Sequence, residues 1–253
     1  MPTVRRVLIT GGGRGIGRAV AVRLAADGHR VAVTARSQGE IDAVAAEVDG
    51  VALAVDLADA DAASALAGRA AEVLGGPVEI FVHAAGVASI APLHKLDPED
   101  WRRAFAVNVD AAFHVSRDLV RPMREAGWGR IVTIASLRAR VGVPTTAAYA
   151  ASKHALLGLT RVIAAELAPH GATANAIVPG WVDTQMVQDE ISKFASALDV
   201  PREEAARRLL REQKIGRFLQ PDEVAGLVGY VCSEQAAGVT GQALHIDGGS
   251  YQA

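Results

Sequence analysis

Tyr149 and Lys153, a tyrosine and a lysine four residues apart, are the residues of this sequence best suited to acid–base chemistry. Residues four apart lie on one face of an α-helix, so the phenol and the ammonium can face the same cleft. A phenol titrates near pH 10, and a nearby fixed positive charge favours phenolate, which brings the group into use near neutral pH. The spacing is common by chance, and a surface tyrosine beside a solvated lysine is the alternative.

A glycine-rich turn near the N-terminus is suited to holding the phosphates of a cofactor. It runs from Thr10 to Gly17 and reads T-G-G-G-R-G-I-G, between a β-branched run and an amphipathic stretch. Glycines permit unusual dihedrals and let a pyrophosphate approach a helix N-terminus. The spacing meets neither the strict dinucleotide pattern nor the Walker pattern. A surface turn that binds nothing is therefore the alternative.

The end of the second expected strand bears on the choice of nicotinamide cofactor. Preference for the unphosphorylated cofactor needs a carboxylate about 20 residues beyond the glycines. This chain has Ala35, Arg36 and Ser37 there, and a guanidinium offers a 2′-phosphate charge-assisted hydrogen bonds. Arg14 can contribute a second positive charge. These residues predict NADP(H) rather than NAD(H), and two solvated surface arginines are the alternative.

Asp56 and Leu57 close the third expected strand. The Asp56 carboxylate can accept a hydrogen bond from an adenine amino group. It can equally serve only as the N-cap of the following helix.

The elements that must position these residues follow a regular alternation of β-branched runs with Ala- and Leu-rich stretches of helical period. This alternation predicts an α/β fold: a doubly wound, seven-stranded parallel sheet with helices on both faces. The expected strands are Val4–Thr10, Arg30–Ala35, Val51–Asp56, Glu79–His83, Arg130–Ser136, Thr173–Val178 and Gln242–Ile246. One helix carries clear entry signals, with Asp97 as N-cap and Pro98 at its first position.

Residues 184–216 break this alternation. Two helical pieces, Gln185–Leu198 and Arg202–Gln213, are joined around Pro201. Ligands of an open parallel sheet bind outside the carboxyl ends of the strands, and this insertion is placed to cover them. We expect a helical substrate lid.

Composition bounds the class of protein. The 253 residues, half apolar and 21% charged, fit a single domain spanning 1–253. The net charge of −2 gives no indication of nucleic acid or an anionic membrane as partner. No signal-peptide or transmembrane pattern is found, which predicts a cytoplasmic protein. Cys232 is expected as a buried structural thiol, and the seven histidines lack metal-ligand spacing, so we expect no metal site.

Taken in order, the motifs resemble those of the short-chain dehydrogenase/reductase family, whose fold is of the Rossmann type, and the resemblance covers essentially the whole chain. The family's glycine motif is Thr10–Gly17, its Y-x-x-x-K motif is Tyr149–Lys153, and its P-G motif begins at Pro179. Its catalytic serine, 13 residues before the tyrosine, matches Ser136, and its asparagine matches Asn108. The implied catalytic residues are therefore Asn108, Ser136, Tyr149 and Lys153. The implied cofactor-binding residues are Thr10, Gly11, Arg14, Gly15, Ile16, Gly17, Arg36, Ser37, Asp56, Leu57, Ala85, Gly86, Tyr149, Lys153, Pro179, Gly180, Val182 and Thr184.

The resemblance also implies a mechanism, in which hydride passes between a nicotinamide and a carbonyl or secondary alcohol carbon. Tyr149 would be the general acid for reduction and the base for oxidation, and Ser136 would hydrogen-bond the substrate oxygen. Lys153 would lower the pKa of the tyrosine and hold the ribose. Asn108 would fix a water that relays protons to Lys153.

One segment departs from the family pattern. Where the family usually has N-N-A-G after the fourth strand, this chain has His83, Ala84, Ala85 and Gly86. A histidine replaces only part of the hydrogen bonding of two amides, so we expect an effect on cofactor affinity or local stability rather than on chemistry. His83 as a catalytic base is the alternative.

The lid and the segment after Ser136 bear on the substrate. Basic residues gather there: Lys193, Arg202, Arg207, Arg208, Arg211, Lys214, Arg138 and Arg140. Such a rim suits phosphate, and the lid resembles that of members acting on 3-oxoacyl thioesters, 3-hydroxybutyrate or polyketides. We therefore expect a 3-oxoacyl group carried on coenzyme A or an acyl carrier protein. The alternative is a solvated helix face, balanced by Glu203, Glu204 and Glu212.

Two other functions stay open. One is a dehydrogenase of a small cyclic, aromatic or sugar secondary alcohol, with the lid as a hydrophobic cover. The other is a non-catalytic cofactor-binding protein, against which the complete set of catalytic residues argues. The resemblance further implies a homotetramer built through the long helices around Asn108 and Tyr149.

Overall fold

The computed structural model describes residues 3–252, which form one parallel sheet of seven strands. The strands are β1 (Arg6–Thr10), β2 (Arg30–Ala35), β3 (Val51–Ala54), β4 (Ile80–His83), β5 (Gly129–Ile134), β6 (Ala172–Pro179) and β7 (Ala243–Ile246). Their order across the sheet is β3-β2-β1-β4-β5-β6-β7. The predicted fold class is confirmed, although β1, β3 and β5 are shorter than expected, so Asp56 follows β3 and Ser136 follows β5 rather than ending these strands. Chain order reverses between β1 and β4, where such sheets bind ligands.

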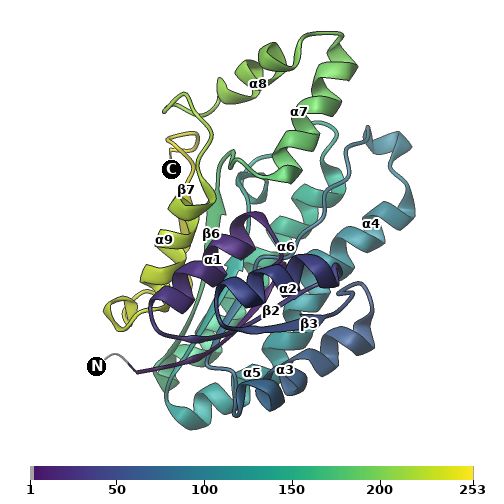
Figure 1. Ribbon diagram of the computed structural model, residues 1–253. Helices are drawn as coiled ribbons and strands as arrows, with labels where there is room; N and C mark the ends of the chain where they lie inside the picture. Colours follow the sequence, from purple (N-terminus) through teal and green to yellow (C-terminus); the bar gives the residue numbers. More distant parts are fainter. Residues whose placement is uncertain (1–2, 253) are drawn as a thin grey trace.

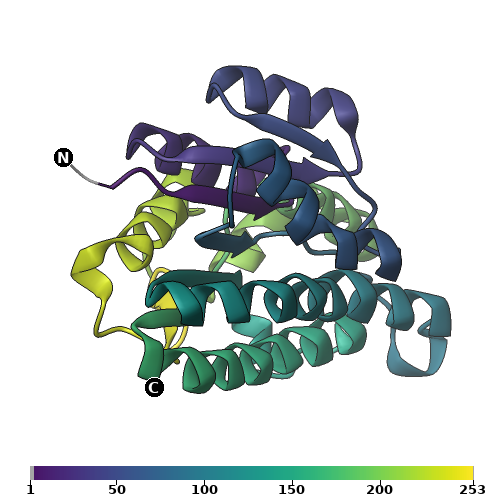
Figure 2. The same ribbon diagram turned by 90° about the horizontal axis from the view of Figure 1, so that it is seen from below.

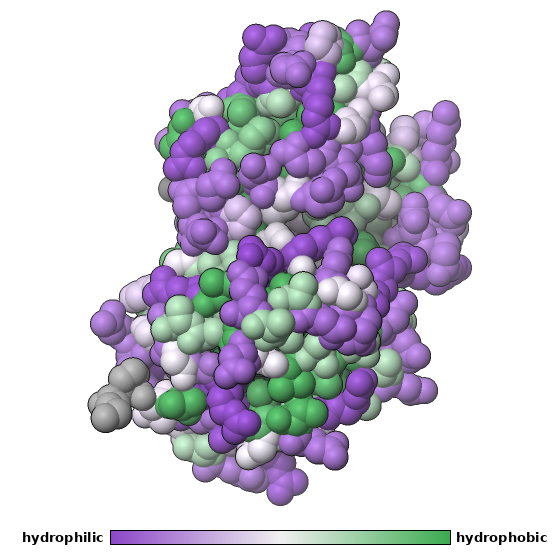
Figure 3. All heavy atoms as spheres, viewed as in Figure 1, coloured by the Kyte–Doolittle hydropathy of each residue, from purple (hydrophilic) through white to green (hydrophobic). Residues whose placement is uncertain are grey.

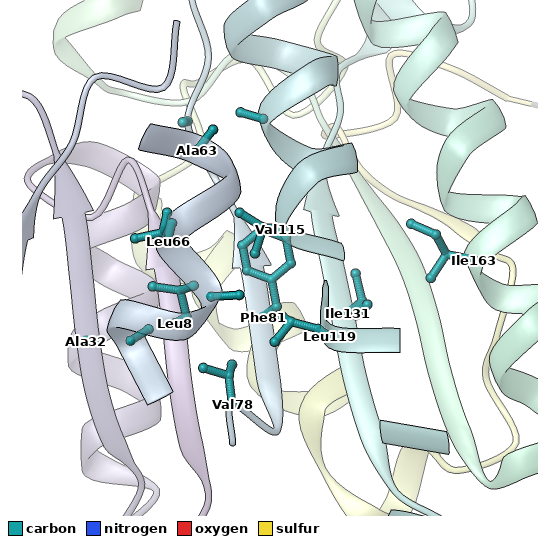
Figure 4. Close-up of a cluster of buried hydrophobic side chains, with 14 of the residues drawn as sticks. Leu8, Ala32, Ala63, Leu66, Val78, Phe81, Val115, Leu119, Ile131 and Ile163 are labelled. Atoms are coloured by element: carbon teal, nitrogen blue, oxygen red, sulfur yellow. The ribbon is translucent and has the colours of Figure 1, made fainter. Parts of the chain in front are cut away.

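Helices cover both faces of the sheet (Figures 1 and 2). On one face lie α1 (Gly15–Ala26), α2 (Gln38–Glu47) and α9 (Pro221–Cys232), and on the other lie α3 (Ala60–Leu74), α5 (Ala111–Ala126) and α6 (Ala147–Leu167). Successive strand residues point to opposite faces, so Val7 and Ile9 join one apolar cluster and Leu8 the other. Figure 4 shows Phe81 at the centre of the second cluster, beside Leu119.

The chain between β4 and α5 contains an irregular helical turn. Helix α4 (Pro98–Phe105) begins as predicted, because the Asp97 carboxylate accepts a hydrogen bond from the Glu99 amide at 2.8 Å. It runs into a π-helical turn, Ala106–Asp110, and then into α5. Such turns often occur at functional sites. This one carries Asn108, which is fully buried.

Residues 184–216, called the lid below, form α7 (Gln185–Leu198) and α8 (Arg202–Leu210), which project beyond the sheet in Figure 1. Hydrophilic side chains dominate the outside of this region in Figure 3. The two helices share a small apolar cluster of Val187, Ile191 and Ala205 with several half-buried neighbours. Helix α8 ends earlier than expected. Gln213 lies beyond it and is buried, with its amide bound to both backbone groups of Trp181 at 2.7 and 3.2 Å.

Three further observations concern residues 3–252. No helix among them is long and apolar enough to cross a membrane. They contain no cluster of three or more His, Cys, Asp or Glu side chains arranged to hold a metal ion. Cys232 is buried as expected, and burial raises the pKa of its thiol to about 12, so the thiol stays protonated.

Candidate active site

A cleft of about 470 Å³, called the inner cleft below, opens at the carboxyl ends of the strands. It is bounded by the glycine turn, the ends of β2 to β6 and the start of α7. Of the predicted cofactor residues, those lining it are Gly11, Arg14, Gly15, Ile16, Gly17, Arg36, Ser37, Asp56, Leu57, Ala85, Gly86, Tyr149, Lys153, Pro179, Gly180, Val182 and Thr184. Segments far apart in the sequence therefore meet in one cleft. Only Thr10 among the predicted cofactor residues does not line it.

The glycine turn is shaped for the close approach of a ligand. Gly11 has φ +68°, and a Cβ there would lie 2.7 Å from the backbone of Ala85. Gly15, with φ +55°, immediately begins α1, so the helix N-terminus and its free N–H groups border the cleft. An anion is stabilised at such a terminus. The cleft and this turn fit the pyrophosphate of a dinucleotide.

Thr10 is buried and acts on the cleft indirectly. Its hydroxyl lies 2.9 Å from Nδ1 of His83 and accepts a hydrogen bond from the Ala85 amide at 3.5 Å. It therefore joins the ends of β1 and β4 beneath the glycine turn. His83 is fully buried, and burial lowers the pKa of its imidazole to about 3, with the Lys153 charge acting in the same direction. A base this weak, held away from the cleft, does not support His83 as a catalytic base.

The end of the inner cleft near α2 combines both signs of charge. Arg36 and Ser37 are exposed there, as the sequence indicates. Arg14 pairs at 3.6 Å with Glu40, which also lines the cleft. Glu40 was not predicted as a residue of the site, and the only indication of it in the sequence is its position in the first turn of the helix after Arg36. In the described part of the chain Arg36 forms no ion pair, so it is a stronger candidate than Arg14 for binding an anion at this end of the cleft.

Asp56 lies beyond β3 and lines the inner cleft. Its carboxylate accepts a hydrogen bond from the Ala58 amide at 3.0 Å. The N-cap of α3 is Asp59 instead, which accepts from the amides of Asp61 and Ala62. The N-cap alternative for Asp56 is therefore wrong, because its carboxylate does not cap α3.

Tyr149 and Ser136 both line the inner cleft and are joined by a hydrogen bond. Ser136 begins a short 3₁₀ helix, Leu137–Ala139, and accepts a hydrogen bond from the Arg138 amide at 3.2 Å. Burial raises the pKa of the Tyr149 phenol, while a hydrogen bond with Ser136 and the Arg138 charge act against the rise. The phenol is therefore held protonated at neutral pH. This direction is opposite to the lowering expected from Lys153.

Lys153 is buried on the same side of α6 as Tyr149. Its ammonium donates a 2.7 Å hydrogen bond to the carbonyl of Ile134, at the end of β5, and lies 5.7 Å from the centre of the tyrosine ring. Burial lowers the pKa of the ammonium to about 8. A Cβ on Gly86 would lie 3.4 Å from Nζ, so this glycine keeps the approach to Lys153 open.

Asn108 supports the site from below rather than lining it. Its amide oxygen accepts from the Val87 amide at 2.8 Å, and its nitrogen donates to the Val87 carbonyl at 3.0 Å and to the Ser152 hydroxyl at 2.9 Å. Both amide N–H groups are thus committed to protein partners. The side chain cannot use them to fix a relay water, so its visible task is to position the loop after β4 against α6.

A second, smaller cavity of about 90 Å³, the outer pocket, adjoins the inner cleft. Both are lined by Ser136, Tyr149, Pro179, Gly180, Met186 and Val187. The remaining wall of the outer pocket combines apolar residues, among them Ile90, Leu137 and Trp181, with the polar or charged residues Ser89, Thr146, Arg138, Glu190 and Glu212. The phenol and the serine hydroxyl therefore stand at the junction of two cavities.

Three of the eight residues of the predicted basic rim, Arg138, Arg207 and Arg208, form ion pairs in the described part of the chain. Arg207 and Arg208 pair with Glu204 at 2.9 and 2.8 Å, and neither lines a cavity. Arg202 bonds to Gln188 and Ser192 within the lid. Of the basic residues named in the rim, only Arg138 lines the outer pocket. Arg202, Arg207 and Arg208 therefore lie on an outer face of the lid, away from both cavities.

Comparisons with known proteins agree with this geometry. A family model described as Enoyl-(Acyl carrier protein) reductase matches residues 11–251. The chain is 36% identical to a D-beta-hydroxybutyrate dehydrogenase of Cupriavidus necator, with 97% of each chain covered. It is 37% identical to the 3-oxoacyl-[acyl-carrier-protein] reductase MabA of Mycobacterium tuberculosis, covering 97% of this chain and 92% of the relative.

A solved structure of a variant actinorhodin polyketide ketoreductase with NADPH superposes with a TM-score of 0.93, at 35% identity and 99% coverage of both chains. A gluconate 5-dehydrogenase homologue from Beutenbergia cavernae with bound NADP superposes with a TM-score of 0.88, at 36% identity, covering 97% of this chain and 96% of the other. These relatives are named as enzymes acting on hydroxyl or keto groups. Together with the family match over nearly the whole chain, they show that this protein is an oxidoreductase of the short-chain dehydrogenase/reductase family.

Proposed function

We propose that this enzyme is an NADP(H)-dependent reductase that delivers hydride to a ketone, with a 3-oxoacyl thioester or a related ketone as substrate. The observation that carries the proposal is the junction at Tyr149 and Ser136, between a cleft large enough for a dinucleotide and a pocket suited to a small acyl group. A nicotinamide bound in the inner cleft would supply the hydride. The relatives named as acyl-carrier reductase and polyketide ketoreductase support this choice of substrate.

The residues at the junction have complementary tasks in reduction. The protonated Tyr149 phenol donates its proton to the carbonyl oxygen as that oxygen gains negative charge. The Ser136 hydroxyl donates a hydrogen bond to the same oxygen. The charged Lys153 ammonium stabilises the phenolate that remains, and Asn108 holds the loop bearing Gly86 in register. In oxidation the same phenolate takes the proton back.

The preference for NADP(H) rests on Arg36 and Ser37, which border the inner cleft and are exposed to it. Glu40 already binds Arg14, so Arg36 is the residue we assign to the 2′-phosphate. Two structural neighbours that carry NADPH or NADP support the assignment.

The decisive experiment is the initial rate of NADPH oxidation with acetoacetyl-CoA, beside free acetoacetate and simple cyclic ketones. Fast turnover only with the thioester supports a 3-oxoacyl reductase. Equal or better rates with the cyclic ketones favour the second candidate, a dehydrogenase of small secondary alcohols. That candidate draws support from the small outer pocket with its apolar wall residues and from the internally paired lid arginines.

We also propose a cytoplasmic homotetramer. Large apolar side chains stay exposed on the two long helices of one face, Phe113 on α5 and Val162 on α6. Exposed apolar positions of this kind suit a symmetric interface between copies. Light scattering of the purified protein tests the subunit number.

A further inference from the structure

The outer pocket has a charge balance that bears on its ligand. Of the residues that line it, four carry ionisable groups: the phenol of Tyr149, which is protonated at neutral pH, and the side chains of Arg138, Glu190 and Glu212. One cation and two carboxylates leave a formal charge of −1 when all three are ionised. The other lining residues are neutral, so nothing else in the wall offsets this charge.

The positive charge of Arg138 is already engaged. Its side chain is only 15% exposed, and its Nη1 lies 3.8 Å from a carboxylate oxygen of Glu212. The guanidinium also lies 5.5 Å from the centre of the Trp181 ring. An anionic ligand would therefore compete with Glu212 for this guanidinium rather than meet a free cation.

Glu190, on α7, faces the pocket from the lid. Within the described part of the chain, its carboxylate forms neither a hydrogen bond nor an ion pair. Partial burial raises the pKa of this carboxyl, against the charges of Arg138 and Lys193. An unpartnered carboxylate beside apolar walls repels a second negative charge strongly, because the local dielectric is low.

The reacting carbonyl must contact Ser136 and Tyr149, which line both cavities, so the groups attached to it extend into the outer pocket. We propose that Glu190, assisted by Glu212, selects substrates whose group beside the reacting carbonyl is uncharged: a 3-oxo ester or thioester rather than a free 3-oxo acid. This inference rests on the proposed ketone reduction and deepens it. Glu190 acts as a specificity-determining residue, and because its charge also raises the pKa of Tyr149, the test compares the ratio of two substrates rather than a single rate.

Ethyl acetoacetate and acetoacetate test the inference, since they share the same reacting ketone and differ in charge. We expect kcat/KM with NADPH to favour the ester by at least about tenfold. Glu190→Gln should shift the ratio of the two kcat/KM values toward acetoacetate by about tenfold. Glu212→Gln removes a mostly exposed charge but also releases Arg138 for an anion, so it should shift the ratio in the same direction, by at least about twofold.

Asp189→Asn is the matched control. It removes a carboxylate from the neighbouring position of α7, where Asp189 is exposed, bonds to Gln185 and lies outside both cavities. The ratio should stay within about twofold of the parent. Equal rates for ester and acid in the parent, or a ratio that Glu190→Gln leaves unchanged, would overturn the inference alone. Absence of NADPH oxidation with both ketones and with acetoacetyl-CoA would overturn the proposed function, and the inference with it.

Discussion

The inner cleft and the outer pocket share Tyr149 and Ser136 but are built from different kinds of structure. The inner cleft is made mostly by strand ends, the glycine turn and α6, which belong to the sheet and the helices packed on it, and only its rim comes from the start of α7. The outer pocket takes Met186, Val187, Glu190 and Glu212 from the lid, whose helices pack mainly on each other, and the rest of its wall from the loops after β4, β5 and β6 and the start of α6. The proposed chemistry therefore depends on residues of the sheet's loops and of α6. We expect the choice of substrate to depend in part on the lid, which supplies both carboxylates of the outer pocket.

The junction between the two cavities should be the most sensitive position. We expect Tyr149→Phe to lower kcat by about a thousandfold, because it removes the proton donor. Cofactor affinity, measured by quenching of protein fluorescence, should persist since the ring stays in place. Turnover near the parent's would end the assignment of Tyr149 as the acid.

Residues at the end of the inner cleft near α2 should affect the affinity for the cofactor and not the chemical step. Arg36→Asp removes the guanidinium and adds a charge that repels a 2′-phosphate. We expect the ratio of affinities for NADP and NAD to fall by about a hundredfold. Titration calorimetry with both cofactors measures this ratio. Arg69→Asp, an equal change at an exposed position of α3, should leave it unaltered, and an unaltered ratio in Arg36→Asp would refute the assignment.

Beneath the inner cleft, His83 should make the fold sensitive to acid. Its pKa is lowered to about 3 in the folded protein, whereas an unfolded histidine titrates at 6.5. The unfolded chain therefore binds the extra proton as pH falls below 6.5, and stability is lost between that pH and about 3. From pH 7 to pH 5 the loss amounts to about 2 kcal/mol.

His83→Asn should remove this part of the acid sensitivity. Urea unfolding at both pH values measures it, with His94→Asn at an exposed position as control. A His83→Asn variant that loses as much stability as the parent between pH 7 and pH 5 would contradict the buried, neutral imidazole.

Substitutions on the outside of the lid should have little effect on substrate binding. Charge reversal of both Arg207 and Arg208 breaks only their pairs with Glu204, and neither residue lines a cavity. We expect KM for acetoacetyl-CoA to change by less than about twofold, since exposed pairs contribute little. A rise of tenfold or more would restore a role for these arginines in binding phosphate, and would move part of substrate recognition outside the outer pocket.

The sheet, its seven strands and the Asp97 helix start could be predicted from the sequence, because each depends on local periodicity and capping. The meeting of Tyr149 and Ser136 followed from motif order. The partners of buried polar groups could not be predicted. The Asn108 amide donates hydrogen bonds to Val87 and Ser152, and the Glu40 carboxylate forms an ion pair with Arg14. These contacts join segments that are remote in the chain or lie in loops.

The direction of the Tyr149 pKa shift could not be predicted from the sequence either. It is decided by burial, which depends on how the lid and α6 enclose the phenol and not on the lysine spacing. The sequence likewise showed the number of positive charges on the lid but not their pairing. Whether a charged side chain can bind a ligand depends on whether it is already paired with a neighbour, which the sequence does not show.

The apolar cluster shared by α7 and α8 has a consequence for how this scaffold can diversify. Because Val187, Ile191 and Ala205 contact one another and half-buried lid neighbours, the two helices carry their own packing with them. The block is joined to the body through Thr184 at one end and Gln213 at the other. Such a block can be exchanged as a cassette, with those two anchors retained. New ligand preferences can then be grafted onto an unchanged hydride-transfer core without redesigning the sheet beneath it.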